Sequence, residues 1–242
     1  MRFAAALALS TLPSVALPNC TTDAMLVFDG STSMAETAAF TGSLPKIAEA
    51  REALGRALPR IEDFRDLGLL IYGPTLVGDA CEGITLHFTP VAQAADPILE
   101  ATGALAPGGL TPLTASIEAA AEAMNYRTQP AVIVLLTDGN ETCGGRPCAV
   151  AERLAASAFE LTVHVIGFRL RVHDEYFRWD NPEQEFGADN VARCLADATD
   201  GLFVTTETVD ELTAALQETL GCALIGGNEF HYRQFPPAND AG

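Results

Sequence analysis

The chain has 242 residues and a formal net charge of −18, from 14 lysine and arginine residues against 32 aspartate and glutamate residues. Hydrophobic residues make up 48% of the sequence and charged residues 19%, which is typical of a chain with an apolar core and argues against intrinsic disorder. Lys46 is the only lysine and the arginines form no basic run, so a nucleic acid or an anionic membrane surface is an improbable partner. The excess of carboxylates favours solubility and the binding of cations.

The first residues are typical of an export signal. Met1-Arg2 supplies positive charge, residues 3–17 carry no charge, and residues 14–16 are small residues of the kind that a signal peptidase reads. The stretch is interrupted by proline and too short for a membrane span, which needs about 20 apolar residues. We therefore predict a cleaved signal peptide at residues 1–16, no membrane insertion after cleavage, and an exported protein, periplasmic or secreted. A buried N-terminal helix is the alternative.

Short apolar runs alternate with amphipathic segments along the rest of the chain. In chain order we predict a strand at 24–28, a helix at 43–61, strands at 67–72 and 84–88, helices at 94–105 and 113–124, a strand at 131–136, a helix at 149–158, a strand at 161–168, a helix at 188–198, a strand at 202–205 and a helix at 209–220. This alternation indicates a doubly wound α/β fold of the Rossmann-like type: a mostly parallel sheet with one antiparallel edge strand and helices on both faces. We place this domain at residues 17–225.

Two segments depart from this rhythm. The inserted loop at residues 169–189 mixes aromatic and acidic side chains and is longer than most connections. Two interpretations stay open for it: a partner-binding loop on the ligand side of the sheet, or a surface flap packed by its own aromatics. Residues 226–242 contain Gly, Pro and Asn and are predicted to form a flexible tail.

The six cysteines fit an exported chain, in which an even number indicates disulfides. Buried free thiols or a zinc site are the alternatives, and zinc is disfavoured because no second cysteine pair has ligand spacing and the histidines are dispersed. Six cysteines allow many connectivities, so any pairing is a hypothesis. The pairs that we predict are Cys143 with Cys148, which would close a small loop, Cys20 with Cys222, which bracket the domain, and Cys81 with Cys194, which are left over.

Three polar segments lie where ligands bind in open α/β sheets, beyond the carboxyl ends of the strands. They are Asp29-Gly-Ser31-Thr-Ser33, Gly-Gly-Leu-Thr111 and Thr-Asp138-Gly. Their candidate ligands are two carboxylates, of Asp29 and Asp138, and three hydroxyls, of Ser31, Ser33 and Thr111. Hard oxygen donors with few charges suit Mg²⁺ or Mn²⁺ better than zinc. The alternative is that the two serines cap a turn and that Asp138 opens a β-turn.

These segments resemble the signatures of the von Willebrand factor type A domain with its metal-ion-dependent adhesion site. The resemblance covers about residues 23–220, and the stretch Thr-Asp138-Gly-Asn-Glu-Thr-Cys143-Gly-Gly-Arg-Pro-Cys148 is similar to an exported bacterial subgroup. It implies a metal-dependent protein-binding module whose last coordination position takes an Asp or Glu carboxylate from a partner protein.

The resemblance also implies individual roles for the five polar residues. Ser31, Ser33 and Thr111 would bind the ion directly, whereas Asp29 and Asp138 would act mainly through coordinated water. Mg²⁺ is the expected ion, with Mn²⁺ or Ca²⁺ as alternatives.

We expect a binding module and no enzymatic activity. The main alternative is a metal-dependent hydrolase or phosphotransferase with Asp29 as nucleophile. That chemistry usually requires a second acid two residues after the nucleophile, where this chain has Ser31. It also requires a cation to neutralise the phosphate, and no lysine is expected near the three segments, because Lys46 is the only lysine. Neither G-x-S-x-G nor a phosphate-binding G-x-x-x-x-G-K-[ST] loop is present. A structural envelope protein with a vestigial metal site is a third hypothesis.

Overall fold

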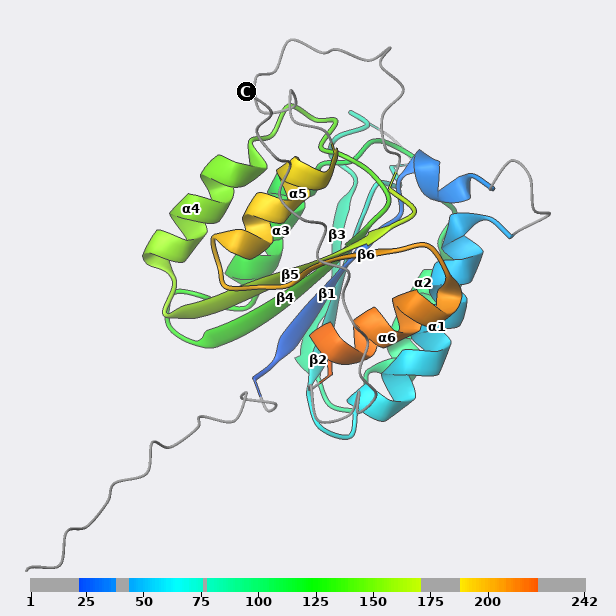
Figure 1. Ribbon diagram of the computed structural model, residues 1–242, viewed down its shortest axis with the longest axis horizontal. Helices are drawn as coiled ribbons and strands as arrows, with labels where there is room; N and C mark the ends of the chain where they lie inside the picture. The colour runs from blue at the N-terminus through cyan, green and yellow to red at the C-terminus, as the bar shows by residue number, and fades with distance from the viewer. Residues whose placement is uncertain (1–21, 38–43, 76–77, 171–187, 222–242) are drawn as a thin grey trace, which may run out of the picture.

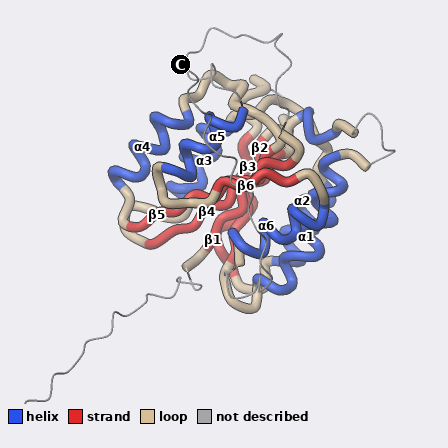
Figure 2. The backbone as a smooth tube through the Cα atoms, in the orientation of Figure 1, coloured by secondary structure: helices blue, strands red, loops and turns tan. Residues whose placement is uncertain are grey.

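The computed structural model describes residues 22–37, 44–75, 78–170 and 188–221. They form a single six-stranded sheet covered by helices on both faces (Figures 1 and 2), in the strand order β3-β2-β1-β4-β5-β6. All neighbouring strands are parallel except β2 and β3, which are antiparallel at one edge. The strands are β1 (Ala24–Asp29), β2 (Leu67–Tyr72), β3 (Ile84–Val91), β4 (Pro130–Thr137), β5 (Glu160–Phe168) and β6 (Phe203–Thr206). The predicted fold class, including the antiparallel edge strand, is confirmed.

The helices divide into two layers because successive side chains of the central strands point to opposite faces. Leu26 and Phe28 of β1 belong to the apolar cluster under α1 (Lys46–Ile61), α2 (Ala95–Ala104) and α6 (Val209–Thr219). Met25 and Val27 belong to the cluster on the other face, under α3 (Leu113–Ala123), α4 (Pro147–Ser157) and α5 (Ala188–Asp197). Every residue of β1 is buried, as expected for a central parallel strand.

The element order is the predicted one, and the differences lie at element ends. Helix α1 begins at Lys46, three residues later than predicted, because Pro45 precedes it in an extended conformation. Strand β3 runs to Val91, beyond the predicted end at residue 88, and pairs with β2 over a shifted register. No helix in the described ranges has both the length and the apolarity that crossing a bilayer requires.

The disulfides correct the sequence prediction. Cys81 pairs with Cys143, and Cys148 pairs with Cys194, so the predicted pairs Cys143–Cys148 and Cys81–Cys194 are wrong. The physical reason is that α4 begins at Pro147. This helix carries Cys148 to its neighbour α5, while Cys143 stays in the preceding loop and meets the loop between β2 and β3.

Several predictions fall outside the described residues. These are the signal peptide at 1–16, the pairing of Cys20 with Cys222, most of the loop at 169–189, and the tail at 226–242.

Candidate metal site at the carboxyl ends of the strands

Two buried aspartates lie side by side where the central strands β1 and β4 end. Asp29 is the last residue of β1, and Asp138 directly follows β4, which is the parallel neighbour of β1 in register Phe28 to Leu136. The exposed fractions of Asp29 and Asp138 are 0% and 2%. The fold therefore places two carboxylates in one poorly hydrated position.

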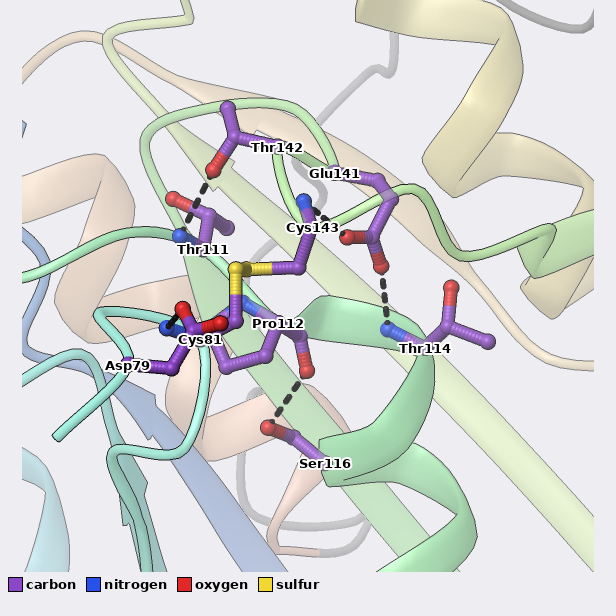
Figure 3. Close-up of a disulfide and its surroundings, with 9 residues drawn as sticks. All are labelled: Asp79, Cys81, Thr111, Pro112, Thr114, Ser116, Glu141, Thr142 and Cys143. Carbon is purple, nitrogen blue, oxygen red and sulfur yellow. Dashed lines mark hydrogen bonds between the residues drawn. A yellow bond between two sulfur atoms is a disulfide. The ribbon is translucent and has the colours of Figure 1, made fainter.

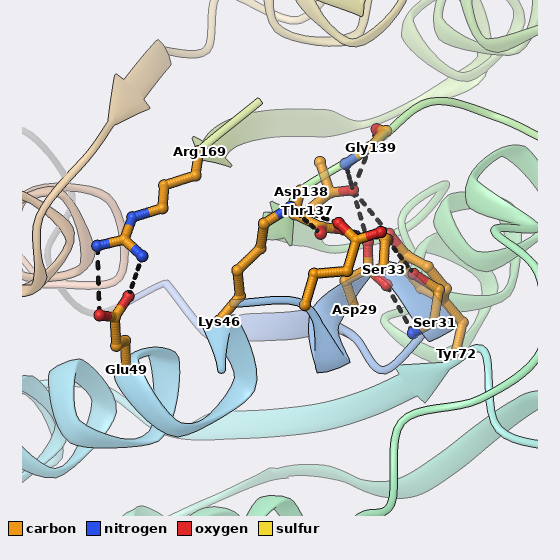
Figure 4. A network of polar contacts seen from close by, with 11 residues as sticks. Asp29, Ser31, Ser33, Lys46, Glu49, Tyr72, Thr137, Asp138, Gly139 and Arg169 are labelled. Atoms are coloured by element: carbon orange, nitrogen blue, oxygen red, sulfur yellow. Dashed lines mark hydrogen bonds and ion pairs between the residues drawn. The ribbon is translucent and has the colours of Figure 1, made fainter. Parts of the chain in front are cut away.

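The two serines connect these aspartates by a chain of hydrogen bonds (Figure 4). The backbone N–H of Ser31 donates to Asp29 Oδ1 at 2.8 Å, and the hydroxyls of Ser31 and Ser33 lie 3.1 Å apart. The hydroxyl of Ser33 then donates to Asp138 Oδ1 at 2.7 Å. Four of the five predicted site residues thus form one continuous polar cluster.

The segment that carries Thr111 is held against the loop after β1. The carbonyl of Gly109 accepts hydrogen bonds from the Thr32 hydroxyl at 2.9 Å and from the Thr32 N–H at 3.3 Å, and Gly108 N–H donates to Gly30 O at 2.9 Å. Gly109 has a φ of +72°, and a Cβ atom there would lie 1.8 Å from the backbone oxygen of Gly73, which follows β2. Only glycine therefore lets this segment also approach the loop after β2 so closely. Thr111 itself is 5% exposed, and no hydrogen bond among the described residues joins its hydroxyl to the other four side chains.

Residues after β4 brace the Thr111 segment from the other side (Figure 3). Thr142 exchanges two hydrogen bonds with Thr111: its hydroxyl accepts from Thr111 N–H at 2.8 Å, and its own N–H donates to Thr111 O at 3.1 Å. The buried Glu141 accepts from Thr114 N–H at 2.8 Å and from Cys143 N–H at 2.7 Å. The Cys81–Cys143 disulfide lies beside these contacts and joins the β2–β3 loop to this brace.

Sequence reasoning missed Thr137 and Tyr72. The Thr137 hydroxyl donates to Asp29 Oδ2 at 2.7 Å and accepts from Tyr72 OH at 3.0 Å. The position of Thr137 next to Asp138, at the end of the strongest apolar run, was an available signal. Tyr72 ends β2, the other neighbour of β1, so the sheet order alone brings it to Asp29.

Lys46 is a correction to the sequence prediction, which expected no lysine near the three segments. Its Nζ atom lies 2.7 Å from Asp138 Oδ2 and 3.6 Å from Glu36 Oε2. Figure 4 shows the ammonium entering the cluster from the first turn of α1, beside a second ion pair between Arg169 and Glu49.

Burial and charge repulsion raise the pKa of Asp29. Desolvation is the larger cause and the carboxylate of Asp138 the second, while hydrogen bonds from Ser31 and Thr137 act in the opposite direction. Burial, and then the charge of Asp29, raise the pKa of Tyr72 as well. Negative charge is therefore costly at this position, and a cation relieves the cost.

The donor set fits a hard divalent ion. It consists of two carboxylates and several hydroxyls, all oxygen atoms, and within the described ranges no group of three or more His, Cys, Asp and Glu side chains gathers as a metal site. An ion held by so few charged ligands keeps several waters, which suits Mg²⁺. The residues present are thus compatible with the predicted cofactor.

Comparison with known sequences gives short similarities. No known family profile matches the chain. Two uncharacterized proteins of Bacillus subtilis (strain 168) are similar to it: YwmD is 51% identical over 41 residues, and YwmC is 32% identical over 91 residues. These stretches cover 17% and 37% of this chain, and 18% and 39% of the two relatives.

Comparison with solved structures covers most of the chain. The pilus adhesin SpaC from Lactobacillus rhamnosus GG has a TM-score of 0.60 at 17% identity, over 84% of this chain and 31% of SpaC. A von Willebrand factor type A protein from Catenulispora acidiphila has a TM-score of 0.53 at 18% identity, over 83% of this chain and 42% of that protein. This chain spans less than half the length of either. The described part of the chain has the fold of a bacterial von Willebrand factor type A domain.

Proposed function

We propose that this protein is a metal-dependent binding module of an exported bacterial protein, and that it captures a partner protein through an Asp or Glu carboxylate. The observation that carries the proposal is the pair of buried carboxylates, Asp29 and Asp138, linked through the backbone N–H of Ser31 and the hydroxyls of Ser31 and Ser33 at the carboxyl ends of β1 and β4. Two buried like charges surrounded by hydroxyls favour a divalent cation.

In this proposal the hydroxyls of Ser31, Ser33 and Thr111 bind the ion, which is Mg²⁺ or else Mn²⁺ or Ca²⁺. Asp29 and Asp138 act mainly through coordinated water. An ion with only two nearby carboxylates keeps positive charge for an anionic oxygen from outside, and this is the chemistry that the metal supplies. The surrounding loops would then select the partner.

Two further observations support an exported adhesion-type protein, periplasmic or secreted. The described residues contain two disulfides, which form in oxidising compartments. The structural relatives include the pilus adhesin SpaC and the minor pilin PilB from Streptococcus sanguinis, the latter with a TM-score of 0.56 at 11% identity, over 84% of this chain and 61% of PilB.

The geometry of Asp29 argues against its use as a nucleophile. Asp29 has no exposed surface, and both of its oxygens accept hydrogen bonds, Oδ1 from Ser31 N–H and Oδ2 from the Thr137 hydroxyl. A nucleophile must present a lone pair to the substrate within a near-attack geometry. These contacts instead suit a carboxylate that orients neighbouring groups around an ion.

The test is a thermal melt of the oxidised protein in EDTA, then with Mg²⁺, Mn²⁺ or Ca²⁺, for the wild type and for Asp29→Asn. We expect the ion to raise the melting temperature of the wild type, because a ligand that binds only the folded state stabilises it by mass action. Asp29→Asn removes one charge and is expected to abolish the rise.

A matched control is needed because a chain with a net charge of −18 attracts cations non-specifically. Asp63→Asn makes the same change on an exposed residue in the turn between α1 and β2, at the opposite end of the sheet. This control should keep the full metal response. An equal response in all three proteins would show that the stabilisation is non-specific, and the proposal would fail.

The partner chemistry is tested on an array of peptides that differ only in one acidic position. Peptides with Asp or Glu should bind in Mg²⁺, and binding should disappear in EDTA or when the acid is replaced by Asn or Gln. Binding that survives both changes would exclude a carboxylate bridge to the metal.

A further inference from the structure

Lys46 is the single lysine of the chain, and its ammonium lies in the candidate site. Lys46 is 6% exposed, and its ammonium lies 2.7 Å from a carboxylate whose side chain has no exposed surface, that of Asp138. The ion pair of Arg153 with Glu118 has side chains 57% and 42% exposed, and that of Arg127 with Glu122 has side chains 54% and 56% exposed. The contact of Lys46 with Asp138 is therefore a buried pair of a different kind.

A buried ion pair is weak support for stability, because the desolvation of both charges offsets their attraction. A lysine that only anchored the first turn of α1 could keep its ammonium in water, since its stem is long and flexible. Here the ammonium instead approaches one oxygen of Asp138 while Ser33 donates to the other. Asp138 is held from both sides, and one of its two partners is the Lys46 ammonium.

We propose that Lys46 is a resident counter-ion of the metal site, which positions Asp138 and lowers the affinity of the site for the divalent ion. This inference rests on the proposed function and adds a residue outside the predicted ligand set. Asp29 and Asp138 carry two negative charges, and Lys46 neutralises one of them before any metal binds. Glu36 Oε2 lies 3.6 Å from the same ammonium, farther than Asp138 Oδ2 at 2.7 Å, so its attraction to Lys46 is the weaker of the two.

The charge balance gives the direction of the effect. With Lys46 present, a divalent ion enters a pair of carboxylates that is already half neutralised, and it is repelled by an ammonium in contact with one of them. Removing the ammonium removes that repulsion and leaves both carboxylates for the ion. In a protein environment a unit charge at this range changes the binding constant by about tenfold or more.

The experiment measures Mg²⁺ binding by calorimetry to the oxidised wild type, Lys46→Met and Lys46→Arg. Lys46→Met keeps the length of the stem and removes the charge, so it should bind Mg²⁺ about tenfold more tightly and melt at a lower temperature in EDTA. Lys46→Arg keeps the charge and should retain an affinity close to that of the wild type. Arg56→Met is the matched control, because it removes a cation from the exposed side of the same helix and should leave the affinity unchanged.

A second measurement uses the wild type alone and does not depend on whether Lys46→Met folds. Protein that is produced with lysine carrying a carbon-13 label at the ε-carbon gives one lysine signal in an NMR spectrum, because the chain contains one lysine. Mg²⁺ should shift this signal in the wild type and leave it in place in Asp29→Asn.

The outcomes separate this inference from the proposed function. If the wild type binds Mg²⁺ but Lys46→Met binds it equally or more weakly, or if the lysine signal does not respond to bound Mg²⁺, Lys46 has only a structural role and the inference is overturned. If Mg²⁺ does not bind the wild type at all, the proposed function fails and the inference fails with it.

Discussion

The hydroxyl of Thr137 uses its full hydrogen-bonding capacity at the centre of the candidate site. A hydroxyl has one proton to donate and two lone pairs. The hydroxyl donates a hydrogen bond to Asp29 Oδ2, and its lone pairs accept hydrogen bonds from Tyr72 OH at 3.0 Å and from Gly139 N–H at 3.2 Å. Thr137 therefore joins the ends of three neighbouring strands, and a residue of the same shape without the hydroxyl would leave the buried Asp29 and Tyr72 with one hydrogen-bond partner fewer.

This arrangement predicts a difference between two substitutions at one position. Thr137→Val keeps the shape but removes the hydroxyl, and it should lower the free energy of unfolding by about 2–3 kcal/mol, because Asp29 and Tyr72 lose a buried partner. Thr137→Ser keeps the hydroxyl and loses one methyl group, which should cost about 1 kcal/mol. Urea denaturation in EDTA measures both values, and an equal loss in the two variants would contradict the role of the hydroxyl.

At the scale of elements, the features that depend on local sequence patterns were predicted correctly. Apolar runs located β1 and β4, and the polar residues that follow them were correctly expected at one edge of the sheet. The contact between Lys46 and Asp138 was not predictable in this way, because it depends on where the first turn of α1 packs in space. It joins residues 92 positions apart.

The disulfide pairings were predicted wrongly for the same reason. Sequence spacing favoured Cys143 with Cys148, but β1 lies between β2 and β4 in the sheet, so the loops after β2 and β4 meet at the same edge. Cys81 and Cys143 are carried by these two loops. Pairing follows strand order, and strand order could not be obtained from the spacing of cysteines.

The two disulfides provide a matched pair of variants at this scale. Cys81–Cys143 and Cys148–Cys194 have sequence separations of 62 and 46 residues, so in the loop-entropy model each constrains the unfolded chain by about 4 kcal/mol. Replacing either pair with alanines should therefore cost similar stability. Only the first pair lies beside Thr111, so only its loss should weaken Mg²⁺ binding, as measured by calorimetry below both melting temperatures. Equal weakening in both variants would show a general effect of lost stability.

At the scale of the whole molecule, one histidine contributes to the loss of stability in acid. His164 in β5 accepts a hydrogen bond at Nδ1 from Leu202 N–H at 2.9 Å, which requires that nitrogen to be unprotonated. Burial, and then the positive charge of Arg65, lower the pKa of His164 from 6.5 to about 4.

The sign of the effect follows from proton binding. Between pH 6.5 and about 4 the unfolded chain binds a proton at His164 and the folded protein does not, so stability decreases as the pH falls through this window. The raised pKa of Asp29 and the decreasing net negative charge act in the opposite direction, so the contribution of His164 appears as a difference between two proteins.

His164→Asn keeps an acceptor near the position of Nδ1 but cannot be protonated. The loss of stability between pH 6.5 and 4 should therefore be smaller in this variant than in the wild type, by up to about 3 kcal/mol. Denaturation at a series of pH values measures the difference. His87→Asn, on the exposed edge strand β3, should change the profile less. Parallel pH profiles for the wild type and His164→Asn would contradict this assignment.

The position of the single lysine has a consequence for proteolysis. A lysine-specific endoprotease finds one peptide bond to cut in the whole sequence, between Lys46 and Ile47. In the folded domain that bond lies in the first turn of α1, and both of its residues are buried. Cleavage requires this turn to unwind and Lys46 to leave Asp138. The appearance of two fragments after reduction of the disulfides therefore reports the opening of the candidate site, without any label or substitution.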